Sequence, residues 1–147
     1  MRFMLIVKGN KDSEAGVLPT EKELAEMGKF NEEMVKAGVM LAGDGLQASS
    51  KGARVQFTKG KPTVVDGPFA EAKELVAGYC IVQTATKAEA VEFGRRMLQI
   101  HIDGTGIDAG EVEIRQVHEL EDFPVSKDEQ PDGWRAKEQA FRDHVVS

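Results

Sequence analysis

Asp66, in the tetrapeptide Asp-Gly-Pro-Phe at positions 66–69, carries a carboxylate at the predicted end of a strand. A carboxylate placed there beside a cleft can act as an acid or a base, or it can hold a cation or hydroxyl of a ligand. The same side chain can instead accept hydrogen bonds from the following backbone amides, while Gly67 supplies backbone freedom and Pro68 begins a helical turn. The sequence leaves a catalytic and a structural role for Asp66 open.

A second aspartate, Asp44, closes another predicted strand in the sequence Gly-Asp-Gly. If both strands end on the same side of the sheet, Asp44 and Asp66 approach each other. Paired carboxylates separate their pKa values or bind a divalent cation. Aspartate between glycines is also a common turn residue, so a structural role for Asp44 stays open beside the chemical one. Asp66 and Asp44 are the candidate catalytic residues.

Other residues near the tetrapeptide are candidates for ligand contacts. Phe69 supplies an apolar plug, and Lys73 lies on a predicted helical turn, where it lines the cleft or solvates the loop. Tyr79 places its hydroxyl in a cavity between subunits or hydrogen-bonds within the core. The predicted ligand-binding set is Asp66, Gly67, Pro68, Phe69, Lys73 and Tyr79.

The sequence contains no pattern typical of a bound metal or cofactor. The single cysteine and three histidines lack the spacing of a zinc site, and no glycine-rich phosphate loop or dinucleotide fingerprint is present. His101 is predicted to follow the second helix, where the helix dipole favours its charged form. Ser49 and Ser50 lie in a polar loop without a nucleophile elbow. We therefore expect neither a metal nor a cofactor.

Composition narrows the class of partners. The chain has 147 residues and a formal charge of −6, so no basic stripe is available for nucleic acid or an anionic membrane. The apolar run at positions 3–7 is too short for a signal peptide or a membrane span. These features predict a cytoplasmic protein of one domain, with no nucleic-acid or membrane partner.

Hydrophobic periodicity predicts the elements that position these residues. Strands over 2–8 and 75–83 are apolar on both faces, which is typical of central strands. Helices over 20–38 and 86–100 each begin with a Thr-x-x-Glu capping pattern, at Thr20 and Thr86. The remaining predicted elements are a strand over 39–46, a hairpin over 54–58 and 63–65, a glycine-rich loop over 103–110 and a strand over 111–117.

This order, β-α-β, hairpin, β-α-β, predicts an α+β ferredoxin-like fold with an antiparallel sheet and two helices on one face. Two helices cover only one face of the sheet, and the other face also carries apolar residues. A second copy of the same sheet is the simplest cover. We therefore predict a homodimer that packs through the helix-free sheet face.

The last part of the chain differs in composition from the predicted domain over 1–118. Residues 119–147 contain eight acidic and four basic side chains. Trp134, Phe141 and Val145 fall near one helical face in this acidic extension. The pattern indicates either a short helix that docks on its own domain or on a neighbouring subunit, or a frayed tail.

Four stretches together resemble a known family: "MRFMLIVKG", "AGVMLAGDGLQASS", "VVDGPFAEAKELVAGYCIV" and "VEIRQV". They are similar to the DGPF-domain group of the YCII-related proteins. The resemblance implies a dimeric α+β barrel and, for some relatives, a functional link to an extracytoplasmic-function sigma factor. Some YCII-like enzymes use a histidine–aspartate pair whose histidine lies in the N-terminal half. This chain has no histidine before His101, so that pair is not carried over.

Pattern and resemblance lead to one functional expectation and one alternative. The first is a small homodimeric α+β-barrel protein that binds a small molecule near Asp66 or serves a regulatory partner. The alternative is a small cofactor-free enzyme, with lyase, isomerase or oxygenase-like activity, that uses Asp66 and Asp44 as acid or base. Dimeric α+β barrels host both kinds of protein, so the fold alone does not decide between them.

Overall fold

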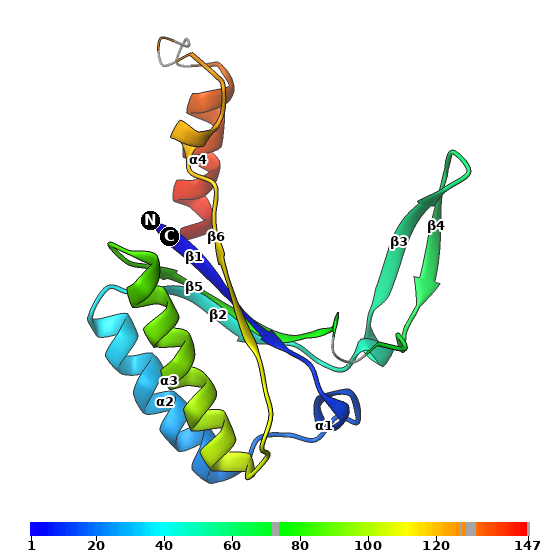
Figure 1. Ribbon diagram of the computed structural model, residues 1–147. Coiled ribbons are helices and arrows are strands. Elements are labelled where there is room, and N and C mark those ends of the chain that lie inside the picture. Colours follow the sequence, from blue (N-terminus) through cyan, green and yellow to red (C-terminus); the bar gives the residue numbers. More distant parts are fainter. Residues whose placement is uncertain (72–73, 127, 129–131, 147) are drawn as a thin grey trace.

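The computed structural model describes the whole chain except residues 72–73, 127, 129–131 and 147. Its centre is a four-stranded antiparallel sheet with the strand order β2-β5-β1-β6 (Figure 1). The two strands that are apolar on both faces, β1 and β5, occupy the central positions, as predicted. The strands of this sheet are β1 (Arg2–Lys8), β2 (Met40–Gly45), β5 (Val76–Gln83) and β6 (Val112–Gln116).

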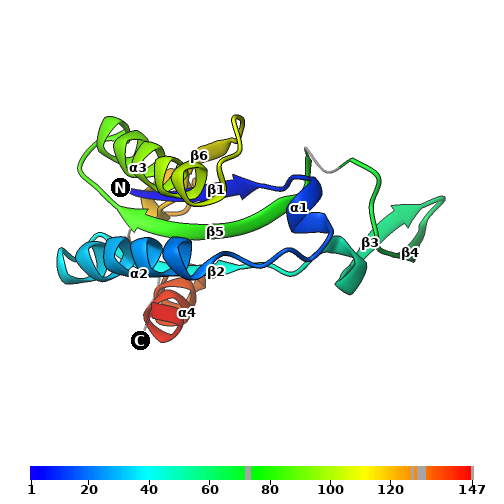
Figure 2. The same ribbon diagram turned by 90° about the horizontal axis from the view of Figure 1, so that it is seen from below.

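Two long helices, α2 (Glu21–Lys36) and α3 (Lys87–Thr105), cover one face of the sheet (Figures 1 and 2). The hydroxyl of Thr20 accepts the N–H of Glu23 at 3.2 Å and thereby caps α2. Thr86 caps α3 in the same way. Helix α3 packs on β1 and β6, whereas α2 packs on β2 and on α3. The predicted ferredoxin-like α+β fold is confirmed.

The core lies between the sheet and these helices. Phe3 and Leu5 of β1 are completely buried, and each such side chain contributes roughly 1.5–3 kcal/mol by leaving water. The only cysteine, Cys80, is buried beside them, and burial raises the pKa of its thiol to about 11. Core residues from the other elements are Phe30, Met34, Val82, Ala90 and Met97.

The glycine in the middle of α3, Gly94, is explained by the packing of this helix on the sheet. A Cβ at Gly94 would lie 3.2 Å from Cδ1 of Ile114 on β6, so the missing side chain lets the helix approach the sheet. The predicted loop over 103–110 begins too early, because α3 continues to Thr105 and ends at Gly106 with a left-handed φ of 71°. His101 therefore lies within the helix rather than after it.

The hairpin of β3 (Ala53–Thr58) and β4 (Lys61–Asp66) forms a separate two-stranded sheet. Every residue of both strands is exposed, including Phe57 at 77% and Val55 at 74%. Register places Val64 opposite Val55 on one apolar face. In Figure 1 the hairpin projects from the side of the main sheet that α2 and α3 do not cover. An isolated hairpin is marginally stable in water, so this face is a candidate for contact with another molecule.

Helix α4 (Trp134–Val146) occupies the second half of the acidic extension and also projects from the helix-free side (Figure 1). Arg142 on α4 contacts Glu119 at 3.2 Å, and Arg2 of β1 contacts the same carboxylate at 2.9 Å. These contacts link α4 to the first strand. Two apolar residues of α4 remain exposed, Phe141 at 62% and Val145 at 65%.

Within the described residues, three short elements were not predicted, because each contains only one turn. They are α1 (Lys11–Glu14) and the 3-10 helices η1 (Ser49–Lys51) and η3 (Leu120–Asp122). Among the helices of the described residues, none combines the length and the apolar character that crossing a bilayer requires.

Candidate functional site

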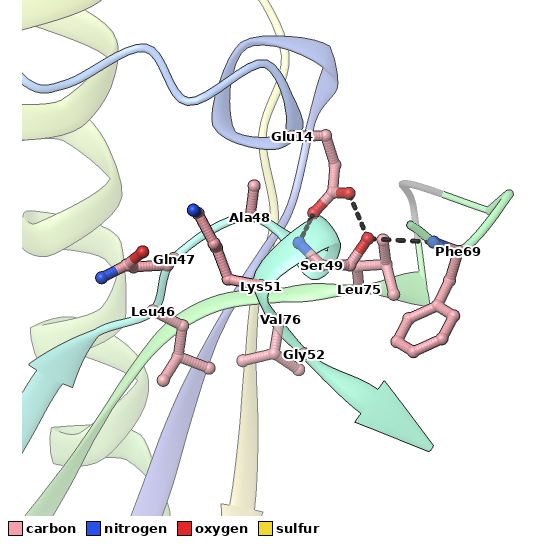
Figure 3. Close-up of a pocket in the computed structure, with 10 residues that line it drawn as sticks. All are labelled: Glu14, Leu46, Gln47, Ala48, Ser49, Lys51, Gly52, Phe69, Leu75 and Val76. Atoms are coloured by element: carbon pink, nitrogen blue, oxygen red, sulfur yellow. Dashed lines mark hydrogen bonds between the residues drawn. The ribbon is translucent and has the colours of Figure 1, made fainter. Parts of the chain in front are cut away.

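A pocket of about 310 Å³ lies where α1, η1 and the start of β5 meet the tetrapeptide at 66–69, which we call the DGPF corner. Figure 3 shows Leu46, Val76 and the ring of Phe69 on one side of the loop that carries Ser49, and Glu14 reaching Ser49 from the opposite side. The lining consists of Glu14, Leu46, Gln47, Ala48, Ser49, Lys51, Gly52, Phe69, Leu75 and Val76.

Ser49 is the centre of the hydrogen bonding in this pocket. Its hydroxyl donates to Oε2 of Glu14 at 2.5 Å, and its backbone N–H donates to Oε1 of the same carboxylate at 3.1 Å (Figure 3). Its Oγ accepts the N–H of Phe69 at 3.0 Å. Hydrogen bonds to a carboxylate are stronger than neutral ones. Ser49 therefore joins α1, η1 and the DGPF corner.

Gly67 lies directly against η1. A Cβ at position 67 would be only 1.7 Å from the carbonyl oxygen of Ser49, so no other residue type fits without a shift of the backbone. The N–H of Gly67 donates to the carbonyl oxygen of Gly52 at 3.0 Å. The glycine of the DGPF corner is thus required by close approach to the loop that carries Ser49.

Phe69 connects the pocket to the hairpin. The guanidinium carbon of Arg54, on β3, lies 3.9 Å from the centre of the Phe69 ring. Such a cation–π contact contributes roughly 0.5–1 kcal/mol at an exposed site. Lys51 lines the same pocket, and no ion pair joins Arg54 or Lys51 to an acid in the described part of the chain. The pocket therefore has two cationic groups nearby.

The predicted ligand-binding residues separate in the structure. Phe69 lines the pocket, whereas Asp66 ends β4, pairs with Ala53 and is exposed outside the lining. Gly67 is half-buried and Pro68 is exposed. Lys73 lies outside the described residues. Ligand binding by the residues of the DGPF corner stays a prediction. Among these residues, Phe69 is the one that lines the pocket.

Asp44 and Asp66 belong to different sheets. Asp44 lies on β2 opposite Tyr79, whose hydroxyl donates to it at 3.3 Å. No hydrogen bond joins the two aspartates in the described parts of the molecule, and these parts hold no group of three acids, histidines or cysteines suited to a metal ion. The catalytic roles of Asp66 and Asp44 stay a prediction.

Sequence reasoning missed Glu14 and treated Ser49 as an ordinary loop residue. The two residues are 35 positions apart, and no motif in the sequence contains both of them. Their only shared signal is that each falls in a short polar stretch after a strand. The pair is therefore visible only once the chain is folded.

A known protein family matches most of this chain. The YCII-related domain matches residues 1–121, which include the four-stranded sheet, the hairpin and the entire pocket. The chain belongs to the YCII-related family. Helix α4 follows the part of this YCII-related protein that the family shares.

One relative of this chain is an uncharacterized protein of Rhizobium meliloti (strain 1021). It is 29% identical over 75 residues, which make up 51% of this chain. The match spans 60% of the length of that protein. Because the relative is itself uncharacterized, it assigns no activity to this YCII-related protein.

Proposed function

We propose that this YCII-related protein binds a small molecule in the pocket beside the DGPF corner. The observation that carries this proposal is a concave site of about 310 Å³ in which apolar side chains surround a few polar groups. Ligand sites in proteins usually have this composition and begin at roughly this size. The hydrogen bonds of Ser49 support the proposal, because they hold three loop segments of the wall in place before a ligand arrives.

The lining favours a ligand with an apolar body and an anionic group. Leu46, Phe69 and Val76 offer the apolar contact, and Lys51 offers a cation. Both oxygens of the Glu14 carboxylate already accept hydrogen bonds from Ser49, which lowers the repulsion that this carboxylate exerts on an anion. A small carboxylic acid with a hydrocarbon or aromatic part matches these groups.

We further infer that the functional unit is a homodimer formed through the helix-free sheet face. Met4 and Ile6 alternate with the buried Phe3 and Leu5 on β1, so they point away from the helices. Tyr79 and Ile81 lie opposite them on β5. A second sheet would cover these side chains, and the hairpin and α4, which project on the same side, would extend the contact (Figure 1).

Binding of benzoate and hexanoate, followed by ligand-observed NMR and thermal unfolding, tests the pocket. We expect saturable binding that stabilises the fold by mass action and that weakens about tenfold in Lys51→Ala. Lys61→Ala is the matched control, since Lys61 lies on β4 outside the pocket lining, and it should bind as the wild type does. Equal binding by wild type and Lys51→Ala, or none by either carboxylate, would contradict the proposed ligand class.

A further inference from the structure

A second site lies between α2 and α3, away from the DGPF corner. Glu23 of α2 is only 5% exposed, although it carries a carboxylate. Its Oε1 lies 2.5 Å from Nδ1 of His101 on α3. Its Oε2 is buried and lacks a hydrogen-bond partner among the described residues. The pattern Thr20-x-x-Glu23 suggested a capping box, but the Glu23 carboxylate is directed toward His101 instead.

A buried carboxylate oxygen without a donor is costly. Leaving a buried polar atom unsatisfied costs about 1–3 kcal/mol, and more when the group is charged. A donor from outside the protein removes this cost if space exists beside the oxygen. Glu23 lines a pocket of about 160 Å³, and its other lining residues are Lys22, Glu26, Ile100, Asp103 and Gly104.

Gly104 keeps this pocket open. A Cβ at position 104 would lie 2.8 Å from Cβ of Glu23, so a larger residue would push the two helices apart or displace Glu23. Gly104 lies in the last turn of α3, one residue before the helix ends at Thr105. The close approach of α2 and α3 at Gly104 therefore leaves no room for a side chain at this position of the pocket wall.

The charge of the lining selects a cation. Glu23, Glu26 and Asp103 contribute three carboxylates, against the single ammonium of Lys22. A metal ion requires several oxygen ligands converging within roughly 2.0–2.6 Å, and the described residues contain no such group of three. An organic cation has N–H donors spread over a larger distance, which suits carboxylates that do not converge on a single point.

We propose that this pocket binds a small organic cation through an ammonium or guanidinium group that donates a hydrogen bond to Oε2 of Glu23. Further negative charge comes from Asp103, whose carboxylate accepts the side-chain amide of Gln99 at 2.8 Å, and from Glu26, which pairs with Lys29 at 3.6 Å on the exposed surface. The volume of about 160 Å³ corresponds to about five water molecules at ~30 Å³ each, which is enough for a head group of a few heavy atoms. The site is independent of the pocket at the DGPF corner.

The test is a titration of the full-length ¹⁵N-labelled protein with ethylguanidinium chloride and, separately, propylammonium chloride, with sodium chloride as the ionic-strength control. We expect saturable shifts of the amides of Glu23, His101 and Gly104. Glu23→Gln should weaken binding about tenfold, and Asp103→Asn about threefold. Glu21→Gln removes an exposed carboxylate from the first turn of the same helix and should change affinity less than about twofold.

Three results would overturn the proposal. The first is the absence of saturable shifts beyond those that sodium chloride produces. The second is unchanged affinity in Asp103→Asn together with unchanged affinity in Glu23→Gln. If Glu23→Gln fails to fold, the exposed Asp103→Asn alone decides. The third is a shift of the Gly104 amide on dilution of the protein alone, because a lysine or arginine side chain of another copy would then occupy the pocket.

Discussion

Gly67 lies so close to Ser49 that a Cβ at position 67 would stand 1.7 Å from the carbonyl oxygen of Ser49. The atom in the way belongs to the backbone, so rotation of a side chain cannot relieve the contact. Because Ser49 also binds Glu14 and Phe69, a shift of its backbone disturbs the whole wall of the pocket.

Gly67→Ala should therefore destabilise the protein by about 3 kcal/mol or more, as forced backbone shifts and overpacking do. Chemical denaturation measures the change. Gly28→Ala in α2 is the matched control, because a Cβ there meets nothing within 4 Å and alanine favours a helix. The control should stabilise the fold by about 0.5–1 kcal/mol. Similar unfolding free energies for Gly67→Ala and the wild type would contradict the described packing.

Ser49→Ala removes the donor to Glu14 and the acceptor of the Phe69 N–H in one step. We expect a loss of about 1–3 kcal/mol in the free energy of unfolding, since two half-buried polar groups lose a partner. Ser50→Ala changes the exposed neighbour and should stay within about 0.5 kcal/mol of the wild type. Equal losses for both variants would mean that the Ser49 hydroxyl does not hold the pocket together.

Glu119→Gln should destabilise the fold at neutral pH and have no effect at low pH. The side-chain hydrogen bond from Arg2 is the main cause that lowers the pKa of the Glu119 carboxyl in the folded state. The ionised Glu119 carboxylate stabilises the fold fully above the ordinary pKa of glutamate. This stabilisation is lost as the pH falls through the lower pKa that the carboxyl has in the folded state. Because Glu119 remains about one-third exposed, we expect about 0.5–1 kcal/mol.

Thermal unfolding of both proteins across the acidic range measures this difference. Glu121→Gln is the control, since Glu121 is exposed in η3 next to the same ion pairs. A difference between Glu119→Gln and the wild type that persists unchanged at the acidic end would show that the charge of Glu119 is not its source.

Ile6→Asp should dissociate the proposed homodimer without unfolding the subunit. Ile6 points to the helix-free face and lies opposite Tyr79, so a charge there opposes sheet-to-sheet packing. Sedimentation should show a dimer for the wild type and a monomer for the variant. Val91→Asp alters an exposed apolar residue of α3, on the other side of the sheet, and should remain dimeric. A wild-type monomer at micromolar concentration would rule out the dimer.

Cys80 should resist alkylation by iodoacetamide in the native protein at mildly alkaline pH. Burial raises the pKa of its thiol to about 11, so little thiolate is present, and the sulfur is shielded by the core. In denaturant the reaction should become fast. Because the sequence contains one cysteine, the intact mass reports modification at this position alone. Equal rates in the two conditions would contradict the buried position of Cys80.

Much of the fold was predictable because its determinants are local or periodic. The two-faced apolar pattern of residues 2–8 and 75–83 identified the central strands, and threonine caps marked both helix starts. The end of α3 was missed, because Gly104 reads as a loop residue until its contact with Glu23 is known. The sequence of β3 and β4 predicted a hairpin. The same pattern of side chains fits a hairpin that is covered and one that is exposed, so its exposure could not be predicted.

The candidate site was less predictable than the fold. Phe69 was singled out and does line the pocket, but the Glu14–Ser49 pair depends on three loops meeting in space. Glu23 followed a capping pattern whose threonine does cap α2, yet its own carboxylate is buried against His101. Serine and glutamate can each make a local contact or a contact with a residue far away in the sequence. Only the packing of the folded chain decides which of these contacts Ser49 and Glu23 make.

The projecting hairpin joins the body of the molecule through two strands, and both strands end beside the pocket. Gly52 precedes β3 and Gly67 follows β4, and a hydrogen bond of 3.0 Å joins these two glycines. Arg54, one step into the hairpin, stacks on Phe69. The two ends of the hairpin are therefore tied to each other and to Phe69, so a displacement of its turn at Gly60 would act on the pocket wall through both strands.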